Sequence, residues 1–316
     1  MQVDLAQAIA LIKRGEVVAI PTETVYGLAA DARNEGALKQ IFAIKQRPTN
    51  NPLIVHLASS EQVLDWATVF PPLAQKLAAA FWPGPLTIVL PAKESVSSIL
   101  RAGEPTVALR VPAHQIAQQV LQQTGLGLAA PSANKYTQLS PTTAQHVANG
   151  LGNSVPVLDG GACQVGIEST IVAIDGDQWQ LLRLGMISEA QVASVVGVQS
   201  KLPTLQDDKP LPKVPGQHLL HYSPKTPVEL FASRAALLQA AENADCAALL
   251  LGEGKIASGK TFNLPNEPVS FAEQLYDTLH QMDALAVAIL LIEAPPRQPE
   301  WLAIHDRLTR ASRKLN

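Results

Sequence analysis

The sequence predicts an α/β protein with a large domain built on a twisted mixed sheet and a second, smaller α/β domain. The chain has 316 residues, of which 47% are hydrophobic and 16% charged, so it can bury more than one core. In the first 200 residues, amphipathic helical stretches alternate with apolar runs, and strands then cluster. After a polar, proline-rich break the alternation resumes in a shorter form, which indicates the second domain.

The first domain is expected over residues 1–200. Residues 3–16 carry apolar side chains at helical spacing and end near a glycine, and residues 17–22 form a short apolar run that predicts a buried strand. Further helices are predicted near residues 35–47, 71–84, 113–124 and 142–150. Further strands are predicted at residues 52–58, 85–92, 106–112, 126–134, 155–161, 169–176 and 178–185.

A linker that can act as a lid is expected over residues 201–226, because residues 200–217 are rich in Pro, Lys and Asp and have no apolar period. Residues 227–316 then alternate strand and helix three times, which predicts a small, Rossmann-like α/β domain. No Gly-x-Gly-x-x-Gly motif opens its first helix, so the sequence gives no support for dinucleotide binding there.

Composition argues against several classes of protein. The net charge of −3, the pI of about 6.2 and the 4% aromatic content do not favour nucleic-acid binding. Cys163 and Cys246 have neither disulfide-framework nor zinc-site spacing, and no His or carboxylate cluster has metal-ligand spacing. No apolar run reaches the roughly 18 residues that span a bilayer, and the charged N-terminus is not a signal peptide, so we expect a cytoplasmic protein with no membrane contact.

A loop of hydrogen-bond donors follows the helix predicted at residues 35–47. Lys45 and Arg47 lie in its last turn, where cations ordinarily complement the helix dipole. Asn51 follows closely, and together these groups suit phosphate oxygens. His56 lies in the next apolar strand, where a lone histidine is more often a core residue with satisfied hydrogen bonds.

Two arginines interrupt apolar strands, Arg110 in "TVALRVP" and Arg183 in "QLLRLG". An unpaired buried charge costs several kcal/mol, so each must be paired or must face a cavity. For Arg110 two interpretations remain open: a structural ion pair, with Glu23 or Glu168 as partner, or a clamp for the carboxylate of a small ligand.

Hydroxyl and amide groups follow three other strands. "PTETVYGL" places Thr24 behind a strand, "PSAN" places Ser132 and Asn134 behind another, and "GIEST" places Ser169 beside a third. Ser140 opens a helix, where it is also an ordinary N-cap. No Ser-His-Asp triad is evident. Donors, hydroxyls and isolated arginines without a covalent catalyst are typical of phosphoryl or nucleotidyl transfer, where alignment and electrostatics do most of the catalysis.

These motifs, in this order, resemble the threonylcarbamoyl-AMP synthase family, the YrdC-like fold in its longer, two-domain form. The matching segments are "PTETVYGL", "KQRPTNNPLIVH", "FWPGPLTIVL", "ALRVP", "PSAN" with "SPT", "GIEST" and "LLRLG". The resemblance covers roughly residues 5–200, and the second domain is similar to the one found in the long form. It implies that L-threonine, bicarbonate and ATP give threonylcarbamoyl-AMP and pyrophosphate, the donor for threonylcarbamoyladenosine beside the tRNA anticodon.

The resemblance also implies residue roles. Lys45 and Arg47 would be catalytic. L-threonine would be bound by Thr24, His56, Arg110, Ala130 and Ser169. ATP would be bound by Arg47, Asn51, Thr106, Ser132, Asn134, Ser140, Arg183 and Tyr222. Mg²⁺ would be bound through the ATP phosphates and not by a protein cage. Gly27 would let its turn pass close to the ligand.

The resemblance further implies a transient hand-over of the product to a tRNA threonylcarbamoyl transferase complex, and a weak contact with RNA stays open. One departure concerns the linker, where "PGQHLLHYSP" replaces the usual Pro-Gly-Met-x-Tyr-x-His-Tyr pattern. Two rival functions fit the sequence less well. A carbamoyl transferase module of hydrogenase maturation would carry zinc-finger-like cysteines and an acylphosphatase region, which this chain lacks. A nucleic-acid-binding module fits the acidic balance poorly.

Overall fold

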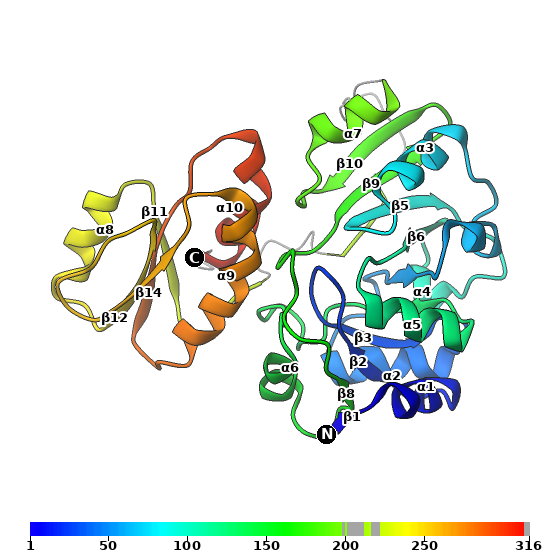
Figure 1. Ribbon diagram of the computed structural model, residues 1–316, viewed down its shortest axis with the longest axis horizontal. Helices are drawn as coiled ribbons and strands as arrows, with labels where there is room; N and C mark the ends of the chain where they lie inside the picture. Colours follow the sequence, from blue (N-terminus) through cyan, green and yellow to red (C-terminus); the bar gives the residue numbers. More distant parts are fainter. Residues whose placement is uncertain (198–199, 201–211, 216–221, 313–316) are drawn as a thin grey trace.

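Two sheets organise the chain, as Figure 1 shows. The structure is a computed structural model that describes residues 1–197, 200, 212–215 and 222–312. Within these residues, a ten-stranded mixed sheet has the order β1-β8-β2-β3-β7-β4-β6-β5-β9-β10, and a four-stranded parallel sheet has the order β11-β14-β12-β13. The α/β fold class with a mixed and a smaller parallel sheet is therefore confirmed.

The large sheet takes its strands from the whole first part of the chain. Its strands are β1 (Gln2–Val3), β2 (Val18–Ile20), β3 (Gly27–Asp31), β4 (Ile54–His56), β5 (Leu86–Pro91), β6 (Thr106–Arg110), β7 (Leu128–Ala129), β8 (Val157–Leu158), β9 (Thr170–Asp175) and β10 (Gln178–Arg183). The helices among them are α1 (Leu5–Lys13), α2 (Glu35–Lys45), η1 (Ser60–Asp65), α3 (Pro72–Phe81), α4 (Ser98–Arg101), α5 (Gln115–Thr124), α6 (Ala144–Leu151) and α7 (Glu189–Val196).

The two faces of the large sheet are covered differently, and this places the site. One face packs with α2, α3 and α7 into a core that includes Val55, Leu109 and Val172. On the other face, α1 and α5 cover the part formed by β2, β3, β7 and β8. The rest of that face, over β4, β5, β6 and β9, carries a small apolar cluster in which Val214 is the member from outside the sheet.

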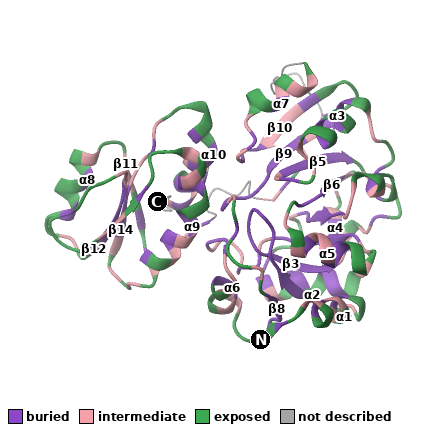
Figure 2. Ribbon diagram, viewed as in Figure 1, coloured by how far each residue is buried: buried purple, intermediate pink, exposed green. Residues whose placement is uncertain are grey.

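The second domain contains β11 (Val228–Phe231), α8 (Arg234–Ala241), β12 (Cys246–Leu251), β13 (Lys260–Leu264), α9 (Pro268–Asp283), β14 (Ile289–Glu293), η2 (Pro299–Trp301) and α10 (Leu302–Ser312). Its buried residues, which include Leu249, Phe271 and Ile304, form a second core, which also takes in Val25 and Ile167 of the first part of the chain. Strands β12 and β14 are largely buried, and much of the outer helix surface is exposed (Figure 2). Helices α9 and α10 lie between the small sheet and the first domain (Figure 1).

Several elements differ from the sequence prediction. Strand β3, which follows the "PTETVY" turn, was not predicted, and neither were β13 and α7. At Gly27 a Cβ would lie 3.0 Å from the Ala130 Cβ. The absence of a side chain therefore lets β3 approach the chain after β7, and the predicted close approach to a ligand stays a prediction.

The predicted boundaries at residues 200 and 226 stay predictions. Ile187 and Val192 still pack in the first core, and Val228 packs in the second. Most of the predicted linker, including Gln217, His218 and Leu219 of its altered motif, lies outside the described residues. In the part of the chain that the structure describes, no helix has the length and apolar character needed to cross a membrane.

Candidate functional site

A pocket opens on the part of the large sheet that α1 and α5 leave uncovered. In the parallel pair β4 and β6, Ile54 lies opposite Ala108 and His56 opposite Arg110. Alternate residues of a strand share a face, so His56 and Arg110 lie on the same side as the apolar cluster of Ile54 and Ala108. The pocket is lined by Thr22, Thr24, Val25, Arg47, Ile54, His56, Arg110, Ala130, Pro131, Ser132, Glu168, Ser169, Arg183, Pro215 and Tyr222.

Most of the predicted site residues meet in this pocket. All five residues predicted to hold threonine line it, as do Arg47, Ser132, Arg183 and Tyr222 of the predicted ATP set. Thr106 does not line it but lies at the far end of β6, on the face that Arg110 shares. Lys45, Asn51, Asn134 and Ser140 lie behind or beside the lining. The structure brings the two predicted sets together, and their roles stay predictions.

Arg110 is buried and is surrounded by acceptors. Its Nη2 lies 2.7 Å from Glu23 Oε1, and its Nη1 donates to Thr24 Oγ1 at 3.0 Å. Of the two partners that the sequence left open, the structure therefore selects Glu23. Among the described residues, neither Glu23 oxygen nor Arg110 Nη2 has a partner with hydrogen-bond geometry. Arg110 therefore forms a structural ion pair with Glu23 and can still bind a ligand, so the two interpretations are compatible.

His56 adds a neutral group beside this pair. Its side chain is buried, and within the described residues its Nδ1 has no hydrogen-bond partner. Burial and the nearby charge of Arg110 lower the pKa of His56 to about 3. The ring is therefore uncharged at neutral pH and adds no further positive charge to the pocket.

Ser169 and Arg183 connect the two predicted ligand sets. Arg183 donates from Nη2 to Ser169 Oγ and from Nε to the Ser169 carbonyl, both at 3.0 Å. The Ser169 hydroxyl also lies 2.7 Å from Thr87 Oγ1. Arg183 Nη1 donates to the Pro215 carbonyl at 3.1 Å, which ties residues 212–215 to the pocket. Burial lowers the pKa of Arg183 below its usual value.

Arg47 supplies a third guanidinium. Its Nη2 donates to the Pro52 carbonyl at 3.1 Å, and the group lies 5.8 Å from the centre of the Tyr136 ring. Asn51 donates to the Tyr136 hydroxyl at 3.4 Å, which places Asn51 beside this arginine. Burial lowers the pKa of Arg47 to about 10, so it remains charged at neutral pH. The pocket therefore combines three guanidinium groups with hydroxyls.

Lys45 is used differently from what the sequence suggested. Its ammonium group is buried and donates to the carbonyls of Ser132 and Asn134, the latter at 2.7 Å. Burial and the charge of Arg47 lower its pKa well below the usual value. In this arrangement Lys45 fixes the backbone of the "PSAN" segment behind the pocket, and its predicted catalytic role remains a prediction.

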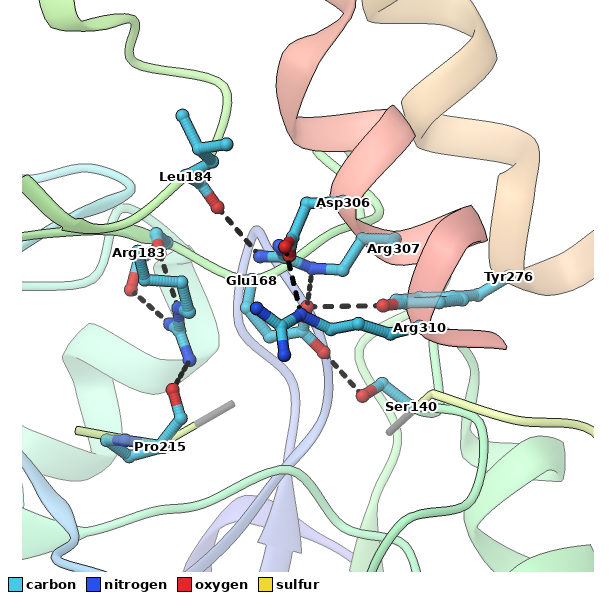
Figure 3. A network of polar contacts seen from close by, with 10 residues as sticks. Ser140, Glu168, Arg183, Leu184, Pro215, Tyr276, Asp306, Arg307 and Arg310 are labelled. Carbon is cyan, nitrogen blue, oxygen red and sulfur yellow. Dashed lines mark hydrogen bonds and ion pairs between the residues drawn. The ribbon is translucent and has the colours of Figure 1, made fainter. Parts of the chain in front are cut away.

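Ser140 and Glu168 form part of a polar network that extends into the second domain (Figure 3). Ser140 is fully buried, and its hydroxyl donates to Glu168 Oε1 at 2.5 Å. Tyr276 Oη and Arg307 Nε donate to the other carboxylate oxygen at 3.2 and 2.9 Å. The predicted ATP contact of Ser140 stays untested, because the structure commits its hydroxyl to Glu168.

Sequence reasoning missed Tyr276 and Arg307 in this network. A signal for Arg307 was present in the final helix, where Ile304, Leu308 and Ala311 form the buried stripe. Arg307 occupies a position on that stripe and is itself 1% exposed. A charged residue on an apolar helical face predicts a buried partner.

Two family profiles match consecutive parts of the chain. The profile described as "Telomere recombination", of the Sua5/YciO/YrdC group, matches residues 10–185, and "Threonylcarbamoyl-AMP synthase, C-terminal domain" matches residues 187–313. The chain belongs to the two-domain threonylcarbamoyl-AMP synthase family. The resemblance of the motifs to this family is thereby confirmed.

Members of this family align over almost the whole chain. The threonylcarbamoyl-AMP synthase of Bacillus subtilis is 38% identical, covering 98% of this chain and 92% of its own. That of Pyrococcus abyssi is 36% identical, covering 96% and 93%. The solved structure of P. abyssi Sua5 complexed with L-threonine superposes with a TM-score of 0.89 at 35% identity, covering 98% and 94%.

Proposed function

We propose that this chain is an L-threonylcarbamoyladenylate synthase, a nucleotidyltransferase that converts L-threonine, bicarbonate and ATP into threonylcarbamoyl-AMP, pyrophosphate and water. The observation that carries the proposal is the single pocket that Arg110, Ser169 and Arg183 line together, with Arg183 bound to Ser169. The proposal is also supported by the relatives from B. subtilis and P. abyssi, which are both named threonylcarbamoyl-AMP synthase, and by the complex of P. abyssi Sua5 with L-threonine.

The threonine half of the pocket would be formed by Arg110, Thr24, His56, Ser169 and the Ala130 backbone. Arg110 would bind the substrate carboxylate, since a guanidinium binds a carboxylate through two charge-assisted hydrogen bonds. The Thr24 and Ser169 hydroxyls and the neutral His56 ring can donate to or accept from the substrate's hydroxyl and amine.

The nucleotide half would be formed around Arg47, Arg183 and Ser132. Both carboxylates near the pocket are already paired, Glu23 with Arg110 and Glu168 with Arg307. In the described residues no group of three or more His, Cys, Asp or Glu is placed to hold a metal ion. This donor set fits a Mg²⁺ held by ATP phosphates, where it would neutralise phosphate charge.

The chemistry requires charge stabilisation more than covalent catalysis. The threonine amine attacks bicarbonate and water leaves, which gives a carbamate. A carbamate oxygen then attacks the α-phosphorus, and the bond to pyrophosphate breaks. Both attacking and leaving groups are anionic, so Arg47 and Arg183 would stabilise the transition state by attracting its negative charge.

The carbamate is unstable in water, which makes exclusion of solvent useful. Tyr222 lines the pocket, and residues 212–215 approach it through the Pro215 carbonyl and the Val214 side chain. We infer that this segment acts as the lid over the nucleotide. The labile product would pass in the cytoplasm to a tRNA threonylcarbamoyl transferase, which would use it to form threonylcarbamoyladenosine.

A pyrophosphate-release assay tests the proposal. Release should require L-threonine, bicarbonate, ATP and Mg²⁺ together, and omission of threonine should abolish it. Filter binding of tRNA at two salt concentrations tests the rival RNA-binding function, whose affinity would fall steeply with salt. Strong salt-sensitive binding without pyrophosphate release would overturn the proposal.

A further inference from the structure

The carboxylate of Glu168 is the point where the two domains meet at the pocket. Glu168 lines the pocket directly before Ser169, and its side chain is buried. The first domain provides one hydrogen bond to it, from Ser140. The second domain provides two, from Tyr276 of α9 and Arg307 of α10. The carboxylate next to Ser169 is therefore held largely by the second domain, whereas Ser169 itself is bound by Arg183 and Thr87 of the first.

Arg307 contacts three separate segments around the pocket. Its Nε donates to Glu168 Oε2 at 2.9 Å, and its Nη2 donates to the Leu184 carbonyl at 2.9 Å. Its guanidinium lies 4.9 Å from the centre of the Tyr222 ring. Figure 3 shows Arg307 reaching from α10 toward Glu168 and Leu184. The remaining nitrogen, Nη1, donates to Asp306 Oδ2 at 2.7 Å, which fixes the orientation of the guanidinium group.

Each of these three contacts adjoins a residue of the pocket. Glu168 precedes Ser169, and Leu184 follows Arg183, whose guanidinium binds Ser169. Tyr222 lines the pocket itself. A shift of Arg307 would therefore disturb both the threonine and the nucleotide half, although Arg307 does not line the pocket.

We propose that Arg307 is a positioning residue through which the second domain fixes the Glu168–Ser169 turn, Arg183 and Tyr222 in the geometry that the reaction requires. The expected effect on kinetics rests on the proposed function, whereas the expected effect on the structure of the turn does not. It assigns the second domain a direct part in the active site.

The charges around Glu168 support this role. Burial raises the pKa of this carboxyl, but the positive charges of Arg307 and Arg183 and the hydrogen bond from Ser140 outweigh burial and lower it below the usual value. Ionised Glu168 can accept from Ser140, Tyr276 and Arg307 at once. Without Arg307, burial would favour the protonated carboxyl, and the turn would lose part of its anchoring at the lower end of the pH range.

The test compares Arg307→Met with Arg234→Met in the full-length protein. Arg234 also pairs with a glutamate, Glu293, whose side chain is 15% exposed. The hydrogen-bond partners of Arg234, which are Glu253, Leu251 and Glu293, all lie in the second domain. Arg234→Met therefore controls for loss of an Arg–Glu pair without a contact at the pocket. Steady-state pyrophosphate release and hydrogen exchange of residues 165–170 and 183–185 are measured for both variants and the wild type.

Arg307→Met should lower kcat/KM for threonine about 100-fold, since small displacements of positioning groups can cost that much. In this variant the acid limb of the pH–rate profile should move to higher pH. Hydrogen exchange of residues 165–170 and 183–185 should accelerate. Arg234→Met should change kcat/KM and the exchange rates of these segments by no more than about threefold, and it should not move the acid limb. Combining Arg307→Met with Glu168→Gln should cost clearly less than the sum of the two single losses, because both variants break the same Arg307–Glu168 ion pair.

Equal effects of Arg307→Met and Arg234→Met, or fully additive effects with Glu168→Gln, would overturn the proposal. If Arg307→Met does not fold, Tyr276→Phe replaces it, because it removes one hydroxyl from Glu168 and leaves the charges. Unchanged exchange of residues 165–170 in that variant would also contradict the claim. If the wild type releases no pyrophosphate, the proposed function fails, whereas hydrogen exchange still decides whether Arg307 positions the turn.

Discussion

Arg110 of β6 and Glu23 of the turn before β3 form a buried ion pair, with Arg110 Nη2 2.7 Å from Glu23 Oε1. The same guanidinium donates to Thr24 and to the Gly84 carbonyl, so three segments of the first domain converge on one charge. Because the geometry of the pair leaves hydrogen-bonding capacity unused, Arg110 is held in place by the protein and still directed at the pocket.

Arg110→Ala should raise the KM for threonine roughly 10- to 100-fold, since a charge-assisted hydrogen bond to the carboxylate is lost. The KM for ATP should change by less than about threefold. Initial-rate kinetics with each substrate varied in turn measures both values. An equal increase for the two substrates would refute the assignment of Arg110 to the threonine carboxylate.

Ser132→Ala should affect ATP binding and not threonine binding, so it serves as the matched control for Arg110→Ala. Ser132 lines the pocket after β7, and its hydroxyl is predicted to bind ATP. Loss of one such hydrogen bond should weaken ATP binding roughly 3- to 10-fold and leave threonine binding unchanged. Isothermal titration with a non-hydrolysable ATP analogue measures the affinity. An unchanged ATP affinity would remove Ser132 from the nucleotide half.

Lys45→Met should lower both stability and ATP affinity, because the Ser132 and Asn134 carbonyls lose their buried donor. Leaving buried carbonyls unpaired costs about 1–3 kcal/mol, measurable as a decrease in the free energy of unfolding in urea. A variant with wild-type stability and wild-type ATP affinity but a much lower kcat would instead support the predicted catalytic role of Lys45.

Acidification should weaken the contact between the domains. His146 of α6 stacks on His280 of α9 at 4.0 Å and lies 3.2 Å from Asp277. Burial and the nearby His280 lower the pKa of His146 to about 4, below its unfolded value near 6.5. The unfolded state therefore binds more protons at acid pH, and stability is lost as the pH falls from about 6.5 to about 4.

Between about pH 7.5 and pH 5, this one group should cost about 2 kcal/mol of unfolding free energy. Urea unfolding of the wild type and His146→Gln at both pH values measures the difference. The variant should lose correspondingly less stability on acidification, and an identical pH dependence in both proteins would contradict the assignment.

The sequence predicted the fold class and several residues that line the pocket, but not every strand. Arg110 and Arg183 could be recognised because a charge in an apolar strand requires a partner or a cavity. Strand β3 was missed because the polar "TETVY" turn hides its start, although four of its five residues are buried. The short parallel strand β13 has only one buried residue, so its apolar pattern is weak.

The contribution of the second domain could not be derived from local patterns. Arg307 and Glu168 are 139 residues apart in the chain, and their pairing depends on how α10 packs against the first domain. Likewise, nothing in the "AIKQR" segment shows that Lys45 turns toward the Ser132 backbone. Such long-range contacts decide which polar residues bind a ligand and which support those that do.

The most direct test of the proposed function uses ¹³C-labelled bicarbonate. The protein is incubated with L-threonine, ATP and Mg²⁺ in labelled or unlabelled bicarbonate, and the nucleotides are separated rapidly and analysed by mass spectrometry. The account predicts an adenylate that contains threonine and is heavier by one labelled carbon in the ¹³C sample, formed in step with pyrophosphate. Release of pyrophosphate without the label in an adenylate product would contradict it.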